Sequence, residues 1–436
     1  MTFRFSTLRT LLKKTFASTL ARNALWMSFG QGTRLVIQAA YFALIARSLG
    51  VTNYGAFISV VALVGIVYPF AAAGRGDLLV RNVARDQSRF PAMWGSALST
   101  IMLCGTLFIG LVIAMSYYAL PHSIPVRLVL LVAFSDIIGL NIITVAGQAF
   151  QSFERLNWTA SLNVLVSASR LTAALLLYFA HRAPSPLQWG YAYFGSTALV
   201  AMIGCWLVSA KLQPPILTFP HSWIDIRQGL YFSISLSAQT VYNDIDKTML
   251  ARLSTLTATG IYGAAYRIID VSFAPVSALL YAAYPNFFRK GATGVSSSLS
   301  YARPLLIRSV SYALLATVAI LLFSGIVPWV LGRQYLDTAE ALRWLAPLPI
   351  LKSMHYCLST SLSGAGHQGI RCVIQVGVAV FNVLINLWLI PHYSWRGAAW
   401  SSIASDALLA AALGAGAFVL AHRERANQTL IEVSPV

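Results

Sequence analysis

The run AMWGSALSTIMLCGTLFIGLVIAMSYYA (residues 92–119) decides the fold class of this 436-residue chain. It is 28 residues long and contains no Asp, Glu, Lys or Arg. An α-helix of about 20 apolar residues crosses the bilayer core, whereas irregular backbone does not face lipid. The run therefore predicts a membrane-spanning helix.

Eleven further apolar runs repeat this pattern along the chain. Short segments that contain Pro or polar residues separate them, as at 121–125 and 183–186. The twelve expected spans are 24–47, 54–74, 92–119, 126–150, 157–180, 188–210, 228–251, 257–286, 304–331, 341–364, 370–391 and 397–421. The sequence predicts an all-α integral membrane protein of about twelve transmembrane helices.

The composition excludes several other classes of protein. Hydrophobic residues make up 57% of the chain and charged residues 10%, whereas soluble domains carry about 25% charged residues. The four cysteines form no C-x-x-C pair, so we expect neither a disulfide framework nor a metal site. The G-x-x-x-x-G-K-[ST] motif is absent, and no cofactor is expected.

The distribution of basic residues predicts the orientation of the chain. With the N-terminus in the cytoplasm, 19 of the 31 Lys and Arg residues fall on the cytoplasmic side and 7 in outer loops. Basic residues collect in cytoplasmic loops. We therefore expect both termini in the cytoplasm, and we attribute the net charge of +18 to topology rather than to a nucleic-acid partner.

Two short matches suggest an internal duplication. LIAR at 44–47 matches MLAR at 249–252, an offset of 205, and YGAF at 54–57 matches YGAA at 262–265, an offset of 208. Parallel repeats related by an axis along the membrane normal are typical of transporters with a substrate site between the halves. The expected parts are a cytoplasmic amphipathic lead-in (1–23), an N-terminal six-helix bundle (24–210), a cytoplasmic linker (211–227), a C-terminal six-helix bundle (228–421) and a cytoplasmic tail (422–436).

Four segments carry a family resemblance: LGVTNYG at 49–55, DKTML at 246–250, GIYGAAYR at 260–267 and GAA at 397–399. In this order they resemble bacterial polysaccharide repeat-unit flippases, which serve O-antigen or exopolysaccharide synthesis. That family belongs to the multidrug/oligosaccharidyl-lipid/polysaccharide exporter superfamily. The resemblance implies a non-enzymatic, alternating-access flippase of the bacterial inner membrane. Its substrate would be a polyprenyl-pyrophosphate-linked oligosaccharide, moved from the cytoplasmic to the periplasmic leaflet, and its partners the bilayer and a polysaccharide polymerase complex.

Five basic residues lie inside the expected spans. A charge in the bilayer centre costs about 2.5–3.5 kcal/mol on insertion scales, so each needs an interior partner or a water-filled cavity. Pyrophosphate is a dense anion that Arg and Lys bind well. We therefore expect a cationic substrate cavity, whose candidate residues are Arg34, Arg170, Lys247, Arg267 and Lys352.

Acidic residues inside the spans have two interpretations. Asp244, Asp246 and Asp270 are candidate sites for a coupling proton or sodium ion. Alternatively, the i,i+3 spacing allows Asp244 to pair with Lys247, and Asp270 with Arg267, within a single helix. His355 is interpreted as a core histidine rather than a proton relay.

Two other functions remain open. One is a multidrug or metabolite exporter of the same architecture, which a cationic cavity disfavours because many exported drugs are cations. The other is a membrane polysaccharide polymerase, which the short loops disfavour because a polymerase needs a catalytic surface outside the membrane.

Overall fold

The computed structural model describes the chain except residues 1–18, 182, 217–222 and 434–436. The first of these stretches holds most of the predicted lead-in, 217–222 lies in the predicted linker, and 434–436 ends the predicted tail. All regular structure in the described part is helical.

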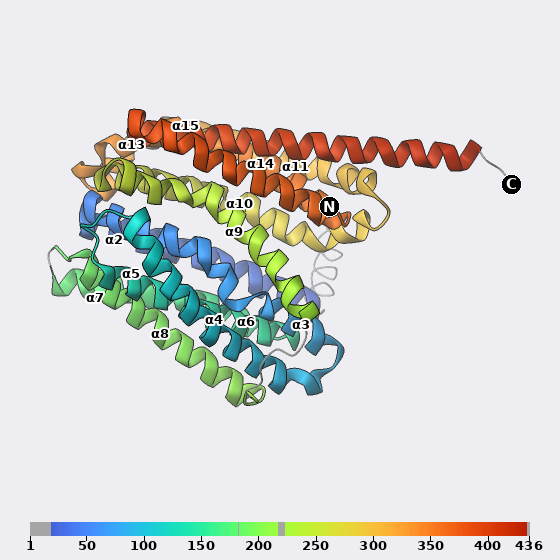
Figure 1. Cartoon of the computed structure of the whole chain (residues 1–436), viewed down its shortest axis with the longest axis horizontal. Helices are drawn as coiled ribbons and strands as arrows, with labels where there is room; N and C mark the ends of the chain where they lie inside the picture. The colour runs from blue at the N-terminus through green and yellow to red at the C-terminus, as the bar shows by residue number, and fades with distance from the viewer. Residues whose placement is uncertain (1–18, 182, 217–222, 434–436) are drawn as a thin grey trace, which may run out of the picture. The chain divides into compact units, whose positions relative to one another are not determined.

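The helices follow one another with short connections (Figure 1). The first ten described elements are α2 (Thr19–Ala72), α3 (Arg75–Arg85), η1 (Gln87–Arg89), α4 (Phe90–Ala119), α5 (Val126–Ala133), the π-helix η2 (Phe134–Leu140), α6 (Asn141–Ser152), α7 (Leu156–Ala180), α8 (Pro186–Lys211) and α9 (Trp223–Leu253). The rest are α10 (Leu256–Gly291), α11 (Val295–Phe323), η3 (Ser324–Ile326), α12 (Val327–Leu331), η4 (Arg333–Tyr335), α13 (Leu336–Leu345), α14 (Leu348–Gly364) and α15 (Gln368–Val433).

Eight helical stretches of the described chain are long and apolar enough to cross a membrane. Two of them, Gly32–Arg85 and Gln368–Glu424, are long enough for two crossings each. Within them, α2 bends at the non-helical residue Gly50 (φ 74°) and α15 at Ser394 (φ 53°). Dividing them there, and adding α9 and the α13–α14 pair, gives the twelve predicted spans. The all-α membrane fold is thus confirmed.

The chain forms two compact units that do not follow its two halves. The first unit comprises 1–44, 67–113 and 129–233, and the second comprises 45–66, 114–128 and 234–436. The boundary runs through α2, α4, α5 and α9. Residues 45–66 therefore pack with C-terminal helices although they lie early in the sequence.

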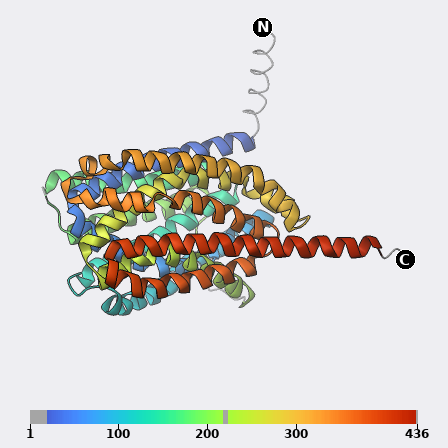
Figure 2. The same cartoon turned by 90° about the horizontal axis from the view of Figure 1, so that it is seen from above.

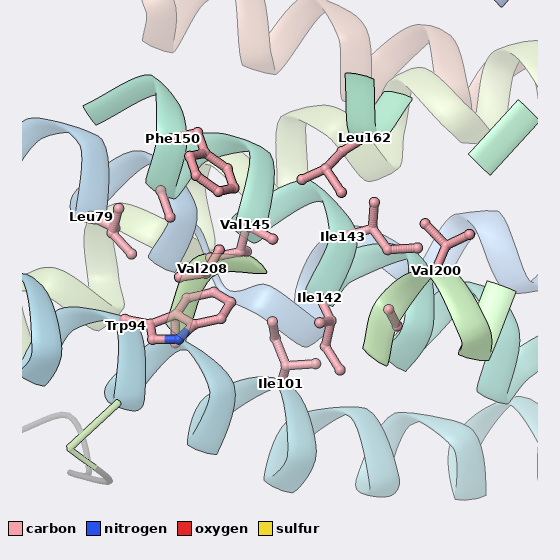
Figure 3. Close-up of a cluster of buried hydrophobic side chains, with 14 of the residues drawn as sticks. Leu79, Trp94, Ile101, Ile142, Ile143, Val145, Phe150, Leu162, Val200 and Val208 are labelled. Atoms are coloured by element: carbon pink, nitrogen blue, oxygen red, sulfur yellow. The ribbon is translucent and has the colours of Figure 1, made fainter. Parts of the chain in front are cut away.

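The first unit has an apolar core built from α3, α4, α6, α7 and α8 (Figure 3). Trp94, Phe90 and Phe150 are its largest side chains, and all three are fully buried. Leu162 and Val200 reach the same cluster from α7 and α8. These residues hold α7 against α8 and so position the polar side chains described below.

In the second unit, α10, α11 and α14 share an apolar core around Phe273, Phe287 and Cys357. α15 packs on α14 through a further cluster that contains Leu362 and Leu413. Both views show α15 running alongside its neighbours, with its C-terminal stretch projecting past them (Figures 1 and 2).

A close backbone contact within the second unit joins α2 to α10. A Cβ atom on Gly55 would lie 1.9 Å from the carbonyl oxygen of Leu256, and one on Gly260 would lie 1.9 Å from that of Val51. Only glycine allows two helices to approach so closely. We refer to these four residues as the Gly55–Gly260 contact.

This contact has a local two-fold symmetry. Thr52 Oγ1 and Thr257 Oγ1 lie 2.9 Å apart beside it. The two threonines, the two glycines and the Val51–Leu256 pair are each separated by 205 positions, the offset of LIAR and MLAR. The residues that meet in this contact are therefore related by the offset of 205. The offset of 208 in the Tyr-Gly-Ala match is three residues longer, which is almost one helical turn.

Candidate functional site

The first unit buries an arginine–aspartate pair that joins three helical elements. Arg170 Nη2 on α7 lies 3.2 Å from Asp136 Oδ1 on η2, and it also donates to Thr197 Oγ1 at 3.3 Å. The Tyr193 hydroxyl donates to Asp136 Oδ1 at 2.8 Å, and the guanidinium carbon lies 4.1 Å from the centre of the Tyr193 ring. We refer to these four residues as the Arg170 cluster.

The π-helix η2 places Asp136 in this cluster. A π-helix inserts a wide turn into an α-helix and is frequent at functional sites. Here it lies between α5 and α6 and packs on α8, where Gly139 lies against Thr197. The extra residue turns Asp136 towards α7 and α8, an effect that hydrophobic periodicity does not reveal.

Arg34 belongs to the same polar region of the first unit. It lies half-buried on α2. Arg34, Asp136 and Arg170 all act electrostatically on the Tyr68 hydroxyl, which lies 3.2 Å from Thr144 Oγ1. The structure thus brings together two of the five predicted cations, Arg34 and Arg170.

The second unit holds two lysines around one tyrosine. Lys247 Nζ on α9 lies 3.9 Å from the centre of the Tyr266 ring, and Lys352 Nζ on α14 lies 4.5 Å from it. Asp244 Oδ1 lies 2.5 Å from Lys247 Nζ, and Asp270 Oδ1 lies 3.3 Å from Lys352 Nζ. We refer to these five residues as the lysine cluster.

The members of the lysine cluster differ in exposure. The side chains of Lys247 and Lys352 are 5% and 4% exposed, whereas those of Asp244 and Asp270 are 38% and 39% exposed. The carboxylates therefore form the accessible surface, and the ammonium groups lie behind them against Tyr266. An anion reaches the lysines only where a carboxylate moves aside.

Asp246 is held in a different way from Asp244 and Asp270. It is fully buried and accepts hydrogen bonds from the Tyr262 hydroxyl and, at 3.0 Å, from Ser402 Oγ. Lys247 Nζ lies 3.8 Å away, farther than from Asp244. Asp246 thus links α9 to α10 and α15.

Arg267 and Asp270 do not pair within their helix, although their spacing allows it. Asp270 pairs with Lys352 of α14 instead. Arg267 is half-buried on α10, and within the described chain no carboxylate lies within ion-pair distance of it. Asp244 and Lys247, by contrast, do form the i,i+3 pair.

A further buried pair lies outside the predicted site residues. His355 Nε2 on α14 lies 3.5 Å from Asp406 Oδ1 on α15, and both side chains are almost fully buried. The signal that could have revealed it is Asp406 itself, a carboxylate in an apolar span with no basic residue on the same span.

Both clusters can balance and exchange charge. No group of three or more His, Cys, Asp or Glu side chains in the described residues could hold a metal ion. Buried cations paired with exposed carboxylates are suited to bind an anion in exchange for the carboxylate, or a cation at the carboxylate itself.

Comparison with known proteins identifies a family and a related protein. A family model described as "Polysaccharide biosynthesis protein" matches residues 20–291. A Haloferax volcanii protein, "Probable low-salt glycan biosynthesis flippase Agl15", is 22% identical over 393 residues, which cover 87% of this chain and 79% of that protein.

Solved structures share the fold. An inward-facing multidrug resistance MATE family transporter of the MOP superfamily has a TM-score of 0.73 at 16% identity, covering 90% of this chain and 96% of that chain. An outward-facing MATE family transporter of that superfamily has a TM-score of 0.64 at 14% identity, covering 94% and 98%. The chain thus has the fold of this superfamily.

Proposed function

Because the chain belongs to the polysaccharide biosynthesis protein family, we propose that it is a flippase for polyprenyl-pyrophosphate-linked oligosaccharides. The family and the fold make it a multi-pass membrane transporter rather than an enzyme. The direction we propose is from the cytoplasmic to the periplasmic leaflet of a bacterial inner membrane. Both termini would then lie in the cytoplasm, and a polysaccharide polymerase would use the product.

The family match carries this proposal, and the lysine cluster supports it. Two ammonium groups share one buried aromatic ring, and each pairs with a partly exposed carboxylate, while the buried Asp246 also lies 3.8 Å from Lys247 Nζ. A diphosphate group has enough charge to replace both carboxylates. We propose Lys247 and Lys352 as pyrophosphate ligands on this ground.

Arginines extend the proposed anion site. Arg267 lies one turn from Asp270 on α10 and needs no carboxylate to move aside before it binds an anion. In the first unit, Arg170 and Arg34 lie in one polar region, where the planar guanidinium of Arg170 is ordered by Asp136 and Thr197. We propose these three arginines as further substrate-binding residues.

Exchange of the carboxylates offers a means of ion coupling. When pyrophosphate displaces Asp244 or Asp270, the freed carboxylate loses its counter-charge in a low-dielectric environment. It then binds a proton or a sodium ion more tightly. We propose Asp244 and Asp270 as coupling sites for this reason, and Asp246 as a third that Tyr262 and Ser402 hold in place.

A multidrug exporter is the second candidate, and the exposure of the acids favours it. Asp244 and Asp270 present negative charge to the surface of the unit, which suits a cationic drug. The two functions make opposite predictions for one variant. Removing the lysine charge abolishes transport of an anionic lipid, whereas it leaves binding of a cation intact or improves it.

Deletion of the gene tests the proposed function. We expect lipid-linked oligosaccharide to accumulate in the inner leaflet of the deletion strain, and the intact gene to restore its export. A Lys247→Ala, Lys352→Ala double variant, compared at equal membrane abundance, should fail to restore export. Normal export in the deletion strain combined with drug sensitivity would favour the exporter.

A further inference from the structure

A glutamine–tyrosine pair joins α9 to α14 beside the lysine cluster. Gln239 Nε2 on α9 donates to the Tyr356 hydroxyl on α14 at 2.7 Å. Both side chains are half-buried, and both residues lie inside the predicted spans 228–251 and 341–364. Polar side chains inside a membrane are costly and often belong to a substrate pathway. The pair is therefore a candidate binding site.

The position of the pair along the two helices places it next to the lysines. Tyr356 lies four residues after Lys352 on α14, and Gln239 lies eight residues before Lys247 on α9. At 1.5 Å per residue, these steps measure about 6 Å and about 12 Å. They run in opposite sequence directions and end at one hydrogen bond, so α9 and α14 are antiparallel here. A sugar ring attached to a diphosphate on the lysines would reach the pair.

Asn243 connects the pair to the lysine cluster. It lies one turn from both Gln239 and Lys247 on α9. Its backbone oxygen accepts from Lys247 Nζ at 3.0 Å, and its Oδ1 accepts from the Tyr266 hydroxyl at 3.2 Å. Its Nδ2 donates to the Gln239 backbone oxygen at 3.0 Å. Asn243 thus holds the pair and the lysine cluster in a fixed relation.

The polar groups on the other side of the pair are buried. Ser233, Ser235 and Ser237 precede Gln239 on α9, and all three are buried and donate hydrogen bonds within the protein. The bond of Ser235 goes to Gln375 Oε1 of α15 at 3.0 Å. From Ser233 onwards, the accessible polar groups of α9 therefore begin at Gln239. This limits the site to the sugars nearest the diphosphate.

The pair has unused hydrogen-bonding capacity. In the described chain, the bond to Tyr356 is the only hydrogen bond of the Gln239 side chain, and the Tyr356 hydroxyl makes no other. Gln239 Oε1 is left as an acceptor and the Tyr356 O–H as a donor. Turning the amide over exchanges these roles but again leaves a donor and an acceptor. Neighbouring sugar hydroxyls, each of which donates and accepts, fit this arrangement.

Neighbouring aromatic rings hold the tyrosine in place. The centre of its ring lies 5.2 Å from that of Phe273 on α10 and 4.8 Å from that of His355 on α14. Phe273 belongs to the buried apolar core of α10, α11 and α14. A hydroxyl on a side chain that is already fixed loses little conformational freedom on binding.

We propose that Gln239 and Tyr356 bind a sugar ring next to the diphosphate, through two neighbouring hydroxyl groups. The identity of the ligand rests on the proposed function, in which the lysine cluster binds the diphosphate. No covalent bond is made or broken. A site that bonds sugar hydroxyls discriminates against a saccharide in which they are missing or differently oriented, because its own polar groups are then left unpaired. The pair thus selects the saccharide by its first sugars.

Sugar binding is tested without the diphosphate, on the full-length protein in detergent. The probe is the oligosaccharide of the parent strain, released from its lipid and its phosphates, and saturation-transfer NMR detects its binding. We expect transfer from the wild-type protein to the sugar, and loss of that transfer in a Gln239→Leu, Tyr356→Phe double variant. A wild type without transfer, or a double variant with equal transfer, overturns the proposal.

A second measurement separates sugar binding from a structural role. Titration calorimetry compares the oligosaccharide diphosphate, freed of its polyprenyl chain, with inorganic pyrophosphate. Tyr356→Phe should lower the affinity for the oligosaccharide diphosphate about 2–10-fold, the effect of one hydrogen bond, and leave the affinity for pyrophosphate unchanged. An equal loss for both ligands means that the pair only joins α9 to α14, and it overturns the proposal.

Thr360→Val provides the matched control. Thr360 is half-buried one turn after Tyr356, and its hydroxyl donates to the Tyr356 backbone oxygen at 2.8 Å within α14. Its affinities for both ligands should equal those of the wild type. If the wild type binds neither pyrophosphate nor the oligosaccharide diphosphate, the proposed function fails at the lysine cluster. The NMR measurement then still decides whether Gln239 and Tyr356 bind sugar.

Discussion

Replacing Gly260 with alanine places a methyl group against the backbone in the Gly55–Gly260 contact. Its carbon would lie 1.9 Å from the Val51 carbonyl oxygen, whereas carbon–oxygen contacts between packed segments lie at about 3.3–3.6 Å. The two segments must therefore separate by more than about 1 Å. Overpacking of this kind costs about 1–3 kcal/mol. That cost shifts the equilibrium from joined to separated segments by roughly 5–150-fold.

Cysteine cross-linking measures this equilibrium. The hydroxyl oxygens of Thr52 and Thr257 lie 2.9 Å apart on exposed residues, which suits a disulfide between Thr52→Cys and Thr257→Cys. The native cysteines to be replaced beforehand are Cys104, Cys205, Cys357 and Cys372. Because the contact is symmetric, Gly55→Ala should slow disulfide formation as much as Gly260→Ala does.

Gly377→Ala provides the matched control. Gly377 lies on α15 in the same unit, and an added Cβ there would meet no atom within 4 Å. Its cross-linking rate should equal that of the parent. If Gly260→Ala also cross-links at the parent rate, the close backbone approach does not hold α2 against α10, and the reasoning from the internal repeat fails.

Three further changes test other parts of the account. Lys352→Ala should reduce export per molecule at least about tenfold, since it removes a charged hydrogen-bond donor, and Lys352→Arg should keep part of the activity; full activity in Lys352→Ala would contradict an anion site there. Asp136→Asn leaves Arg170 buried without its counter-charge, so the free energy of unfolding should fall by about 3–5 kcal/mol, seen as a lower melting temperature, and replacing both residues with leucine should recover most of it; a double variant no more stable than the single one would contradict this. Reporter fusions should place Ser123 in the periplasm and Arg423 in the cytoplasm, whereas a periplasmic Arg423 would reverse the proposed orientation.

Features that depend on local sequence could be predicted. The apolar run at 92–119 became α4, which begins only two residues earlier, because a span of this length has no stable alternative in lipid. The offset of 205 between LIAR and MLAR also carried structural information, since Thr52 and Thr257 meet at that offset. These features require no knowledge of how distant helices pack.

The ion pairs of the candidate site could not be predicted, because they join helices that are distant in sequence. Arg170 finds Asp136 across 34 positions, and Lys352 finds Asp270 across 82. Lys352 and Arg170 lie inside expected spans (341–364 and 157–180) that contain no Asp or Glu. Their need for a partner was therefore predictable, but the identity of the partner depends on the π-turn at Asp136 and on the packing of α14 against α10.

The most direct test of the central claim is a flipping assay with purified protein in liposomes. Polyprenyl-pyrophosphate-linked oligosaccharide is placed in the inner leaflet, and its arrival in the outer leaflet is followed with a glycan-cleaving enzyme outside. The account predicts protein-dependent flipping that added inorganic pyrophosphate inhibits and that the Lys247→Ala, Lys352→Ala variant lacks. Flipping at the rate of protein-free liposomes, with transport of a cationic drug by the same preparation, would contradict it.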